Sequence, residues 1–286
     1  GGRELDSFRD EMLNDNRIRV IHDYPNAGDC FPGVEIKGGV CYFLWEKDNK
    51  GNCSVITHEG DRIVSAVERP LLEDGAETFI RYNEAVSILQ KVRKLKEDSF
   101  ANIVSANDPF GFDVRVENSY RRKKAQFKKE PFNNSIKFYY YGWQKNGIGY
   151  IEKAMINRNI NWLKDYKVFI SKAYGAGETF PHQILNKPII GTPNSCCTET
   201  YLVIGPFSSE EITNNVISYI ETKFFRFLVM LIKNTQNGMK KVYSFVPMQK
   251  FNVKWSDEKL YKKYNLNKDE IAFIESKIRP MGSDDD

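Results

Sequence analysis

The stretch that decides the fold runs from Phe31 to Trp45 and reads FPGVEIKGGVCYFLW. Its first half is rich in proline and glycine, the residues that most often form turns. Its second half, Val40–Trp45, is continuously apolar, which is typical of a strand that is covered on both faces. The stretch therefore predicts a tight loop that leads into a buried strand.

The residues on either side of this stretch predict further elements of a layered fold. Before it, Arg3–Asn14 has the apolar spacing of a helix, and Arg19–Tyr24 is expected to be a short strand. After it, Cys53–His58 is expected to be another strand. A connector at about residues 60–80 then leads to Asn83–Lys96, which has the apolar spacing of a helix.

From about residue 98 onwards the chain has a different character, because short strands and loops dominate. A long helix is then expected to begin at Ser208, which has capping-box spacing with Glu211, and to end at Asn237-Gly238. The other elements expected here are strands at Lys137–Tyr141, Lys167–Ser171, Thr200–Ile204 and Val242–Val246, and short helices near Ser256–Tyr264 and Asn267–Ile278. The whole chain is therefore predicted to be α+β.

Composition sets wide bounds on function. With 286 residues, of which 41% are hydrophobic, the chain can bury a full core, and its net charge of +4 does not by itself indicate a nucleic-acid partner. Five cysteines without CxxC spacing and three scattered histidines predict reduced thiols and no metal site. The longest apolar run, Phe224–Ile232, is too short to span a bilayer. These features predict a cytoplasmic protein with no membrane partner.

Basic residues are concentrated in one part of the chain, together with aromatic residues. A cluster of this composition is typical of a segment that contacts DNA phosphates, although a solvated run of charge is the commoner explanation in general. Its predicted DNA-binding members are Arg121, Arg122, Lys123, Lys124, Lys128 and Lys129.

The order of helix, strand, turn, Phe-Pro-Gly and strand resembles the end of the catalytic domain of S-adenosylmethionine-dependent adenine DNA methyltransferases from bacterial type II (IIG-like) restriction–modification systems. Three later segments, Lys167–Gly177, Pro181–Pro188 and Lys241–Gln249, resemble the target-recognition domain of the same family. The resemblance implies that residues 1–60 hold the terminal strands of a Rossmann-like methyltransferase sheet. Residues 61–286 would then form a mixed, largely antiparallel target-recognition domain.

The resemblance also implies site residues and partners. Phe31 matches the aromatic residue that packs on a flipped adenine in the family, although it could also simply plug the sheet edge. The residues themselves indicate further contacts. The glycine turn Tyr174-Gly175-Ala176-Gly177 and the nearby Lys172 are expected near a DNA phosphate, because glycine lets the backbone approach closely, and His182 and Gln183, which follow the turn, are expected near a base. The implied partners are double-stranded DNA and the remainder of the methyltransferase catalytic domain.

The family's glycine-rich cofactor loop and its Asn/Asp-Pro-Pro-aromatic tetrad have no usable counterpart here. Asn107–Phe110 resembles the tetrad, but Asp108 stands where the first proline belongs. We therefore expect no catalytic residues, no cofactor and no activity in this chain alone, with S-adenosylmethionine bound by the full-length enzyme.

The sequence leaves two other functions open. A stand-alone specificity subunit similar to those of type I restriction systems has no need of strands from a Rossmann-like sheet. A nuclease site can be assembled from Asp29, Glu35 and Lys37, but the resemblance assigns that segment differently.

Overall fold

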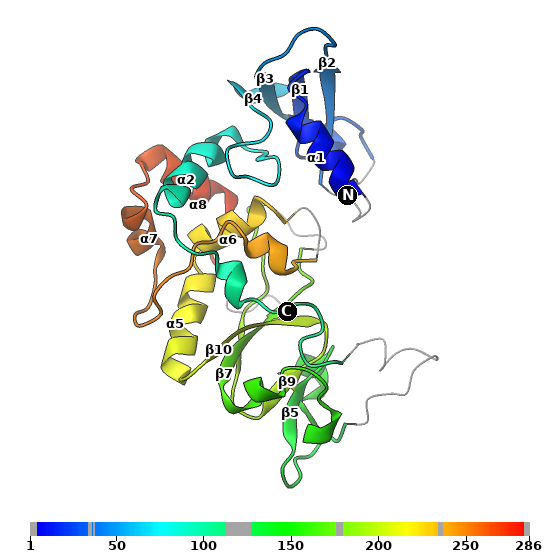
Figure 1. The fold of residues 1–286 in the computed structure, drawn as a ribbon, viewed down its shortest axis with the longest axis vertical. Coiled ribbons are helices and arrows are strands. Elements are labelled where there is room, and N and C mark those ends of the chain that lie inside the picture. Colours follow the sequence, from blue (N-terminus) through cyan, green and yellow to red (C-terminus); the bar gives the residue numbers. More distant parts are fainter. Residues whose placement is uncertain are drawn as a thin grey trace. The chain divides into compact units, whose positions relative to one another are not determined.

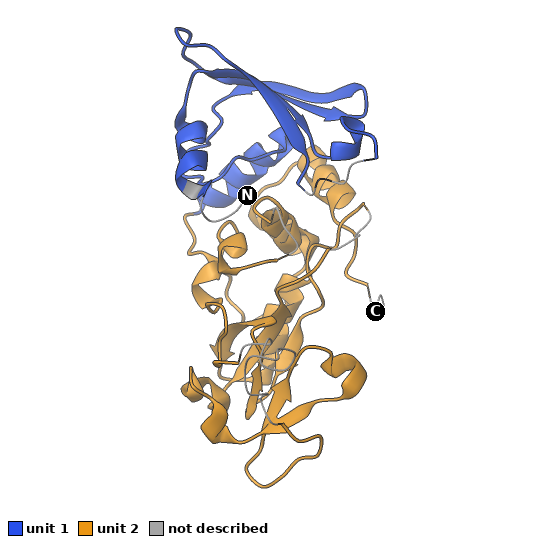
Figure 2. Cartoon of the chain, turned by 90° about the vertical axis from the view of Figure 1, so that its right-hand side faces the viewer, with its two compact units in different colours: residues 1–95 blue, residues 96–286 orange. Residues whose placement is uncertain are grey.

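The computed structural model describes residues 5–33, 36, 38–112, 127–175, 180–233 and 237–282. The chain divides into two compact units, Gly1–Leu95 and Lys96–Asp286 (Figure 2). Both units combine helices with sheets (Figure 1), so the predicted α+β class is confirmed.

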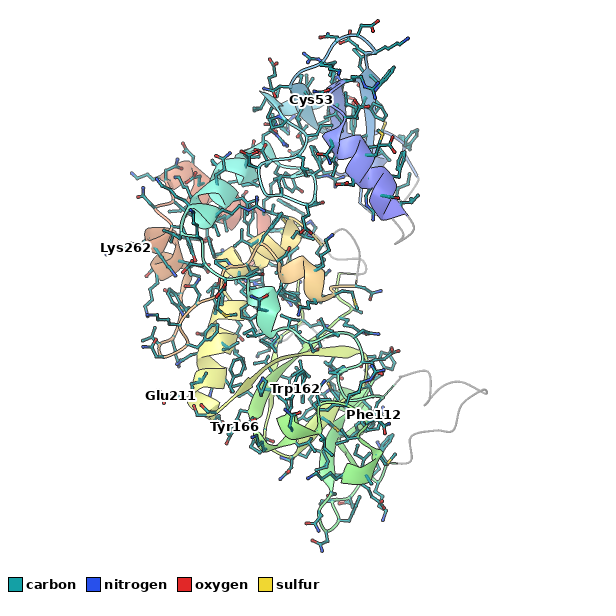
Figure 3. All side chains as sticks on the ribbon, viewed as in Figure 1. Cys53, Phe112, Trp162, Tyr166, Glu211 and Lys262 are labelled. Carbon is teal, nitrogen blue, oxygen red and sulfur yellow. The ribbon has the colours of Figure 1, made fainter. Side chains whose placement is uncertain are left out.

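Unit 1 is built on one four-stranded sheet in the order β2-β1-β3-β4. The central pair, β1 and β3, is parallel, and both outer pairs are antiparallel. Its core contains Ile18, Cys53 (Figure 3), Val55 and Leu71, against which Met12 and Leu13 of the first helix pack. Its elements are α1 (Asp6–Asn14), β1 (Ile18–Tyr24), η2 (Ala27–Asp29), β2 (Val40–Trp45), β3 (Cys53–Glu59), β4 (Arg62–Arg69) and α2 (Asn83–Lys94).

The prediction that Val40–Trp45 is buried on both faces is wrong. These residues form β2, but β2 is an edge strand, and Tyr42, Phe43, Leu44 and Trp45 are each 42–53% exposed. Side chains alternate between the two faces of a strand, and here both faces of β2 are about half exposed. A long apolar edge strand is normally paired or protected in a soluble protein. One edge of the sheet in unit 1 is therefore formed by a strand, β2, that has the apolar composition of an interior strand.

Arg69 and Asn83 tie the sheet of unit 1 to α2. The buried Arg69 donates to Asn83 Oδ1 at 2.7 Å and to the carbonyl of Ile80. Asn83 in turn donates to the carbonyl of Val55 at 3.1 Å. The predicted functional boundary at residue 60 falls between β3 and β4, which are hydrogen-bonded to each other.

Unit 2 contains two small sheets and a group of helices. One sheet has the antiparallel order β10-β7-β8, and the other has the order β6-β5-β9, in which β5 and β9 are parallel. The strands are β5 (Ile136–Tyr139), β6 (Gly149–Ile151), β7 (Tyr166–Ser171), β8 (Ile189–Gly191), β9 (Ser195–Cys197) and β10 (Tyr201–Phe207). The helices are η3 (Phe100–Ile103), α4 (Trp143–Asn146), η4 (Lys153–Met155), η5 (Ile160–Lys164), α5 (Glu210–Ile220), α6 (Lys223–Met230), η6 (Lys240–Tyr243), α7 (Asp257–Lys263) and α8 (Lys268–Lys277).

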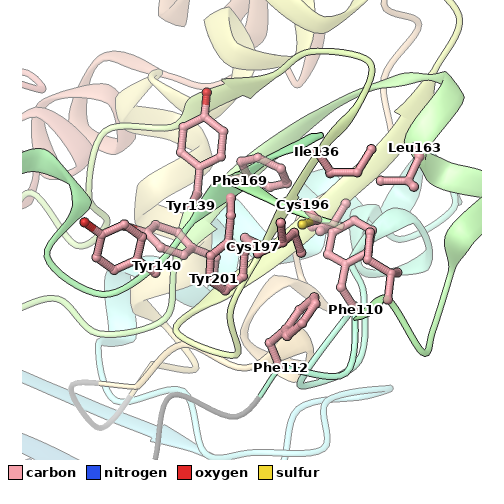
Figure 4. Close-up of a cluster of buried hydrophobic side chains, with 14 residues drawn as sticks. Phe110, Phe112, Ile136, Tyr139, Tyr140, Leu163, Phe169, Cys196, Cys197 and Tyr201 are labelled. Atoms are coloured by element: carbon pink, nitrogen blue, oxygen red, sulfur yellow. The ribbon is translucent and has the colours of Figure 1, made fainter. Parts of the chain in front are cut away.

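A hydrophobic cluster joins the two sheets of unit 2. Phe138 of β5, Phe169 of β7 and Tyr201 of β10 meet in it, together with the adjacent cysteines of β9 (Figure 4). Most neighbouring rings pack edge-on or tilted, as between Phe112 and Phe138, whose centroids lie 5.0 Å apart, whereas Phe138 and Tyr140 are stacked.

The predicted single helix from residue 208 to 236 is instead two helices. The Thr222 hydroxyl accepts from the Phe225 N–H at 3.1 Å and so caps a new helix, α6. The Asp257 carboxylate accepts from the N–H groups of Lys223 and Phe224, which completes the cap. Ser209, rather than Ser208, caps α5.

The strand predicted at Val242–Val246 is also wrong. This segment begins inside η6 and continues as a turn, because hydrogen bonds run locally from Ser244 N–H to the Lys241 carbonyl and from Val246 N–H to the Tyr243 carbonyl.

Lys167 on β7 is a fully buried lysine. Its ammonium donates to the carbonyls of Trp162, Asp165 and Thr192 at 3.1, 2.8 and 3.3 Å. Burial lowers the pKa of Lys167 to about 8. The three carbonyls come from η5, from the strand start and from the turn before β9, so this one side chain joins three segments.

We predict that Lys167→Met lowers the free energy of unfolding by about 2–4 kcal/mol, because buried carbonyls lose their donor. Chemical denaturation measures this change. Lys164→Met, at an exposed position three residues earlier, is the matched control and should change little. Equal stability of the two variants would contradict the assigned role of Lys167.

Candidate nucleic-acid interface

The loop that carries Phe31 has a fixed backbone and an exposed ring. The Phe31 N–H donates to the Ala27 carbonyl at 2.8 Å, and Asn26 caps the short helix η2. Asp29 accepts from Asn26 at 2.7 Å and from the Gly60 N–H at 2.8 Å. Phe31 is 50% exposed, so part of its surface is accessible to a ligand.

An ion pair holds the far end of the same loop. Asp23, buried in β1, lies 2.9 Å from Arg81 Nε, and Arg81 also donates to the Gly38 carbonyl. Burial raises the pKa of Asp23 above its usual range, and the Arg81 charge opposes that rise. Arg81 thus links β1 to Gly38 in the loop that precedes β2.

Four aromatic rings meet on one face of the sheet in unit 1. His22 Nδ1 lies 2.8 Å from His58 Nε2, while His22 stacks on Tyr42 at 4.7 Å and His58 stacks on Tyr24 at 4.3 Å. The two histidines are 36 residues apart in sequence, and parallel pairing of β1 with β3 brings them together. Sequence reasoning missed this group, because no local pattern marks a parallel neighbour.

We predict that the stability of the sheet in unit 1 falls as the pH drops below about 6.5. Burial and, secondarily, the His58 charge lower the pKa of His22, so the unfolded chain binds a proton more readily than the folded one. Stability is then complete above the unfolded pKa and is lost on acidification. Urea denaturation between pH 5 and 8 measures this.

His22→Gln should flatten that pH dependence, whereas His182→Gln, the control in unit 2, should keep it. An unchanged profile in His22→Gln would contradict the role of the histidine pair.

The predicted basic cluster is only partly visible. Arg121, Arg122, Lys123 and Lys124 lie outside the described residues. Lys129 donates to the Tyr140 hydroxyl at 2.5 Å and to the Asn146 carbonyl at 2.9 Å, and Lys128 lies 4.6 Å from the Phe132 ring centroid. Both lysines are exposed, but part of the hydrogen-bonding capacity of Lys129 is used within the fold.

The predicted residues of the glycine turn are held by neighbouring segments. Lys172 donates to Asn107 Oδ1 at 2.6 Å, and the Tyr174 carbonyl accepts from Lys233 at 2.9 Å. Gly175 has a φ of +100°, a backbone angle that favours glycine. Tyr174 and His182 are brought together through Arg279, which contacts the Tyr174 hydroxyl at 3.3 Å and donates its N–H to the His182 carbonyl at 3.0 Å.

Gln183 has a different environment from its neighbour His182. Its side chain is buried, its amide donates to the Leu185 carbonyl at 3.0 Å, and its amide oxygen accepts from the Gly282 N–H at 3.2 Å. A base contact by Gln183 stays a prediction, and the amide would have to give up these hydrogen bonds to make it.

Arg226 is the principal residue of this region that sequence reasoning did not assign. It is 1% exposed and lies on α6, and its guanidinium donates to the carbonyls of Gln183 and Arg279 at 3.1 and 2.8 Å. Its interruption of the apolar run Phe224–Ile232 was the available signal.

Within the described ranges there is no cluster of three or more histidine, cysteine or acidic residues able to hold a metal ion, and no helix long and apolar enough to cross a membrane.

Comparison with known proteins gives two matches. Over 51 residues, 18% of this chain and 12% of the relative, the sequence is 37% identical to an uncharacterized adenine-specific methylase of Mycoplasma pneumoniae. The chain resembles adenine-specific methylases. This confirms the resemblance predicted from the sequence.

Among solved structures, the crystal structure of the type IIG restriction endonuclease BpuSI matches with a TM-score of 0.38 and 11% identity, covering 93% of this chain and 40% of BpuSI. No family model matches. The chain spans less than half the length of either protein.

Proposed function

We propose that this chain provides DNA target recognition within an adenine-specific DNA methyltransferase of a restriction–modification system. The observation that carries this proposal is the similarity of 51 residues of the chain to an adenine-specific methylase. In unit 2, Lys233 donates to the Tyr174 carbonyl, Arg226 to the Gln183 carbonyl and the Arg279 N–H to the His182 carbonyl. Double-stranded DNA is the proposed partner, and the proposed location is the cytoplasm.

Unit 1 is proposed to complete the sheet of the catalytic domain. The open apolar edge of β2 supports this, because such a strand needs a neighbour along its edge and cover on both faces. A stand-alone specificity subunit would have to leave that edge in water. The exposed Phe31 ring is proposed to stack on the flipped adenine.

The described residues do not fit S-adenosylmethionine. Gly175 follows β7, but the next described element is the strand β8, whereas a phosphate- or cofactor-holding glycine loop opens a helix. The methyl donor and the groups that hold it are therefore assigned to the remainder of the enzyme, and no catalytic step is assigned to this chain.

We predict that the chain binds random-sequence duplex DNA at low salt and that its affinity falls steeply as salt rises, since phosphate contacts release counterions. Replacing Arg121, Arg122, Lys123 and Lys124 together with alanine should weaken binding and reduce the slope of log K against log salt by up to about 3–4. Fluorescence anisotropy titrations measure both quantities.

The matched control removes the same charge elsewhere in unit 2, with alanine at the exposed positions Lys250, Lys254, Lys262 and Lys268. This control should retain most of the affinity. Equal losses in the two quadruple variants would mean that binding follows net charge alone, and an absence of wild-type binding at low salt would contradict DNA recognition by this chain.

A further inference from the structure

Phe180 is an exposed aromatic residue directly before Pro181–Pro188, the segment that resembles part of a target-recognition domain. Its side chain is 58% exposed, although it lies between the glycine turn and His182. A single exposed apolar residue is common and needs no explanation. Phe180 stands out because of the way the chain fixes it and because of the charges around it.

The backbone directly after Phe180 is clamped to the end of α8. The His182 N–H donates to the Lys277 carbonyl at 3.0 Å, and the Arg279 N–H donates to the His182 carbonyl at 3.0 Å, forming a parallel bridge opposite the buried Ile278. Arg226 donates to carbonyls on both sides of this bridge, those of Gln183 and Arg279. The ring therefore projects from a rigid base, and little order has to be imposed when it binds a ligand.

One lysine and one histidine lie against the ring. The Lys277 ammonium lies 5.2 Å from the Phe180 ring centroid, and the His182 ring packs edge-on at 5.6 Å. Arg279 follows two residues after Lys277. Glu275, the acidic residue nearest to Lys277 in sequence, is already paired with Lys223 and accepts from the Tyr261 hydroxyl at 2.8 Å. An aromatic ring flanked by cations is the arrangement that proteins use to stack on nucleobases beside phosphates.

We propose that Phe180 is a stacking wedge that inserts at a base step of the bound duplex, with Lys277 facing a flanking phosphate. This inference rests on the proposed DNA recognition and adds a second aromatic contact in unit 2, separate from the role proposed for Phe31. A wedge must unstack a base step, and pyrimidine–purine steps such as TA unstack most easily. The chain should therefore favour duplexes rich in TA steps over A-tract duplexes.

The test replaces Phe180 with alanine, leucine or tryptophan in the full chain. Phe180→Ala should raise the Kd for a TA-rich duplex by about 5- to 100-fold, the range expected for the loss of one base–aromatic stack. The salt slope should stay unchanged, because an uncharged ring releases no counterions. Phe180→Leu, which keeps an apolar wedge without a π face, should lie between Phe180→Ala and wild type.

Phe180→Trp provides a direct readout of stacking. Its affinity should match wild type, and the additional tryptophan emission, measured as the difference from wild type, should be quenched when the duplex is added. Ile160→Ala, which shortens another exposed apolar side chain of unit 2, is the control and should leave the Kd unchanged.

Two results would overturn the inference. Unchanged Kd in Phe180→Ala together with unquenched emission in Phe180→Trp would remove the wedge while leaving DNA recognition intact. Absence of binding by the wild-type chain would instead remove the proposed function and the wedge with it.

Discussion

The buried guanidinium of Arg226 holds together the part of unit 2 that contains Pro181–Pro188. It lies at the break between α5 and α6, where it donates to the carbonyls of Glu221 and Thr222 at 3.1 and 3.2 Å. It also reaches Gln183 and Arg279, which are distant in sequence. Burying a charge is costly unless its hydrogen bonds are satisfied, and carbonyls at a helix end are favourable partners for a cation. The position of residues 180–187 therefore depends on the helix break, and the break depends on the caps provided by Thr222 and Asp257.

The two units differ in how their apolar residues are exposed to solvent. In unit 2 the residues of the hydrophobic cluster around Phe138 and Phe169 are buried, and the large apolar residues exposed in the described part of the unit are separated in sequence: Tyr141, Ile160, Phe180 and Val253. In unit 1 the sheet stops at β2, whose apolar side chains are exposed on both faces. A unit with a closed core can hold its surface residues in fixed positions for a ligand. An open sheet edge can instead pair with a strand from another part of a larger enzyme. This difference agrees with the proposed division into recognition and catalytic parts.

Some of the strands could be predicted. Strands at β1, β2, β3, β5, β7 and β10 were placed within three residues, because each is a short apolar run between turn residues. The connector predicted at about residues 60–80 is wrong in part, because Arg62–Arg69 forms β4. The burial of β2 could not be predicted, since a run of apolar residues looks the same in a central strand and in an edge strand without its neighbour. The break at Thr222 was missed because half of its cap comes from Asp257, 35 residues away in sequence.

The candidate site was predictable to a smaller extent. Phe31 is exposed and Gly175 has a positive φ, while the DNA contacts expected of both residues stay predictions. The side chains of Lys129 and Gln183, in contrast, form hydrogen bonds whose partners only the tertiary fold supplies. The pairing of His22 with His58 and the clamped base of Phe180 likewise depend on contacts between segments far apart in sequence.

The measurement that tests DNA recognition by unit 2 most directly is photocrosslinking of the chain to a duplex that carries 5-iododeoxyuridine, followed by mass spectrometry of the linked peptides. We predict crosslinks in residues 115–130 and 172–187 of unit 2, and the loss of these crosslinks when unlabelled duplex is added in excess. Crosslinks confined to unit 1, or none under conditions where a known DNA-binding protein is labelled, would contradict the assignment of unit 2 as the part of the chain that recognises DNA.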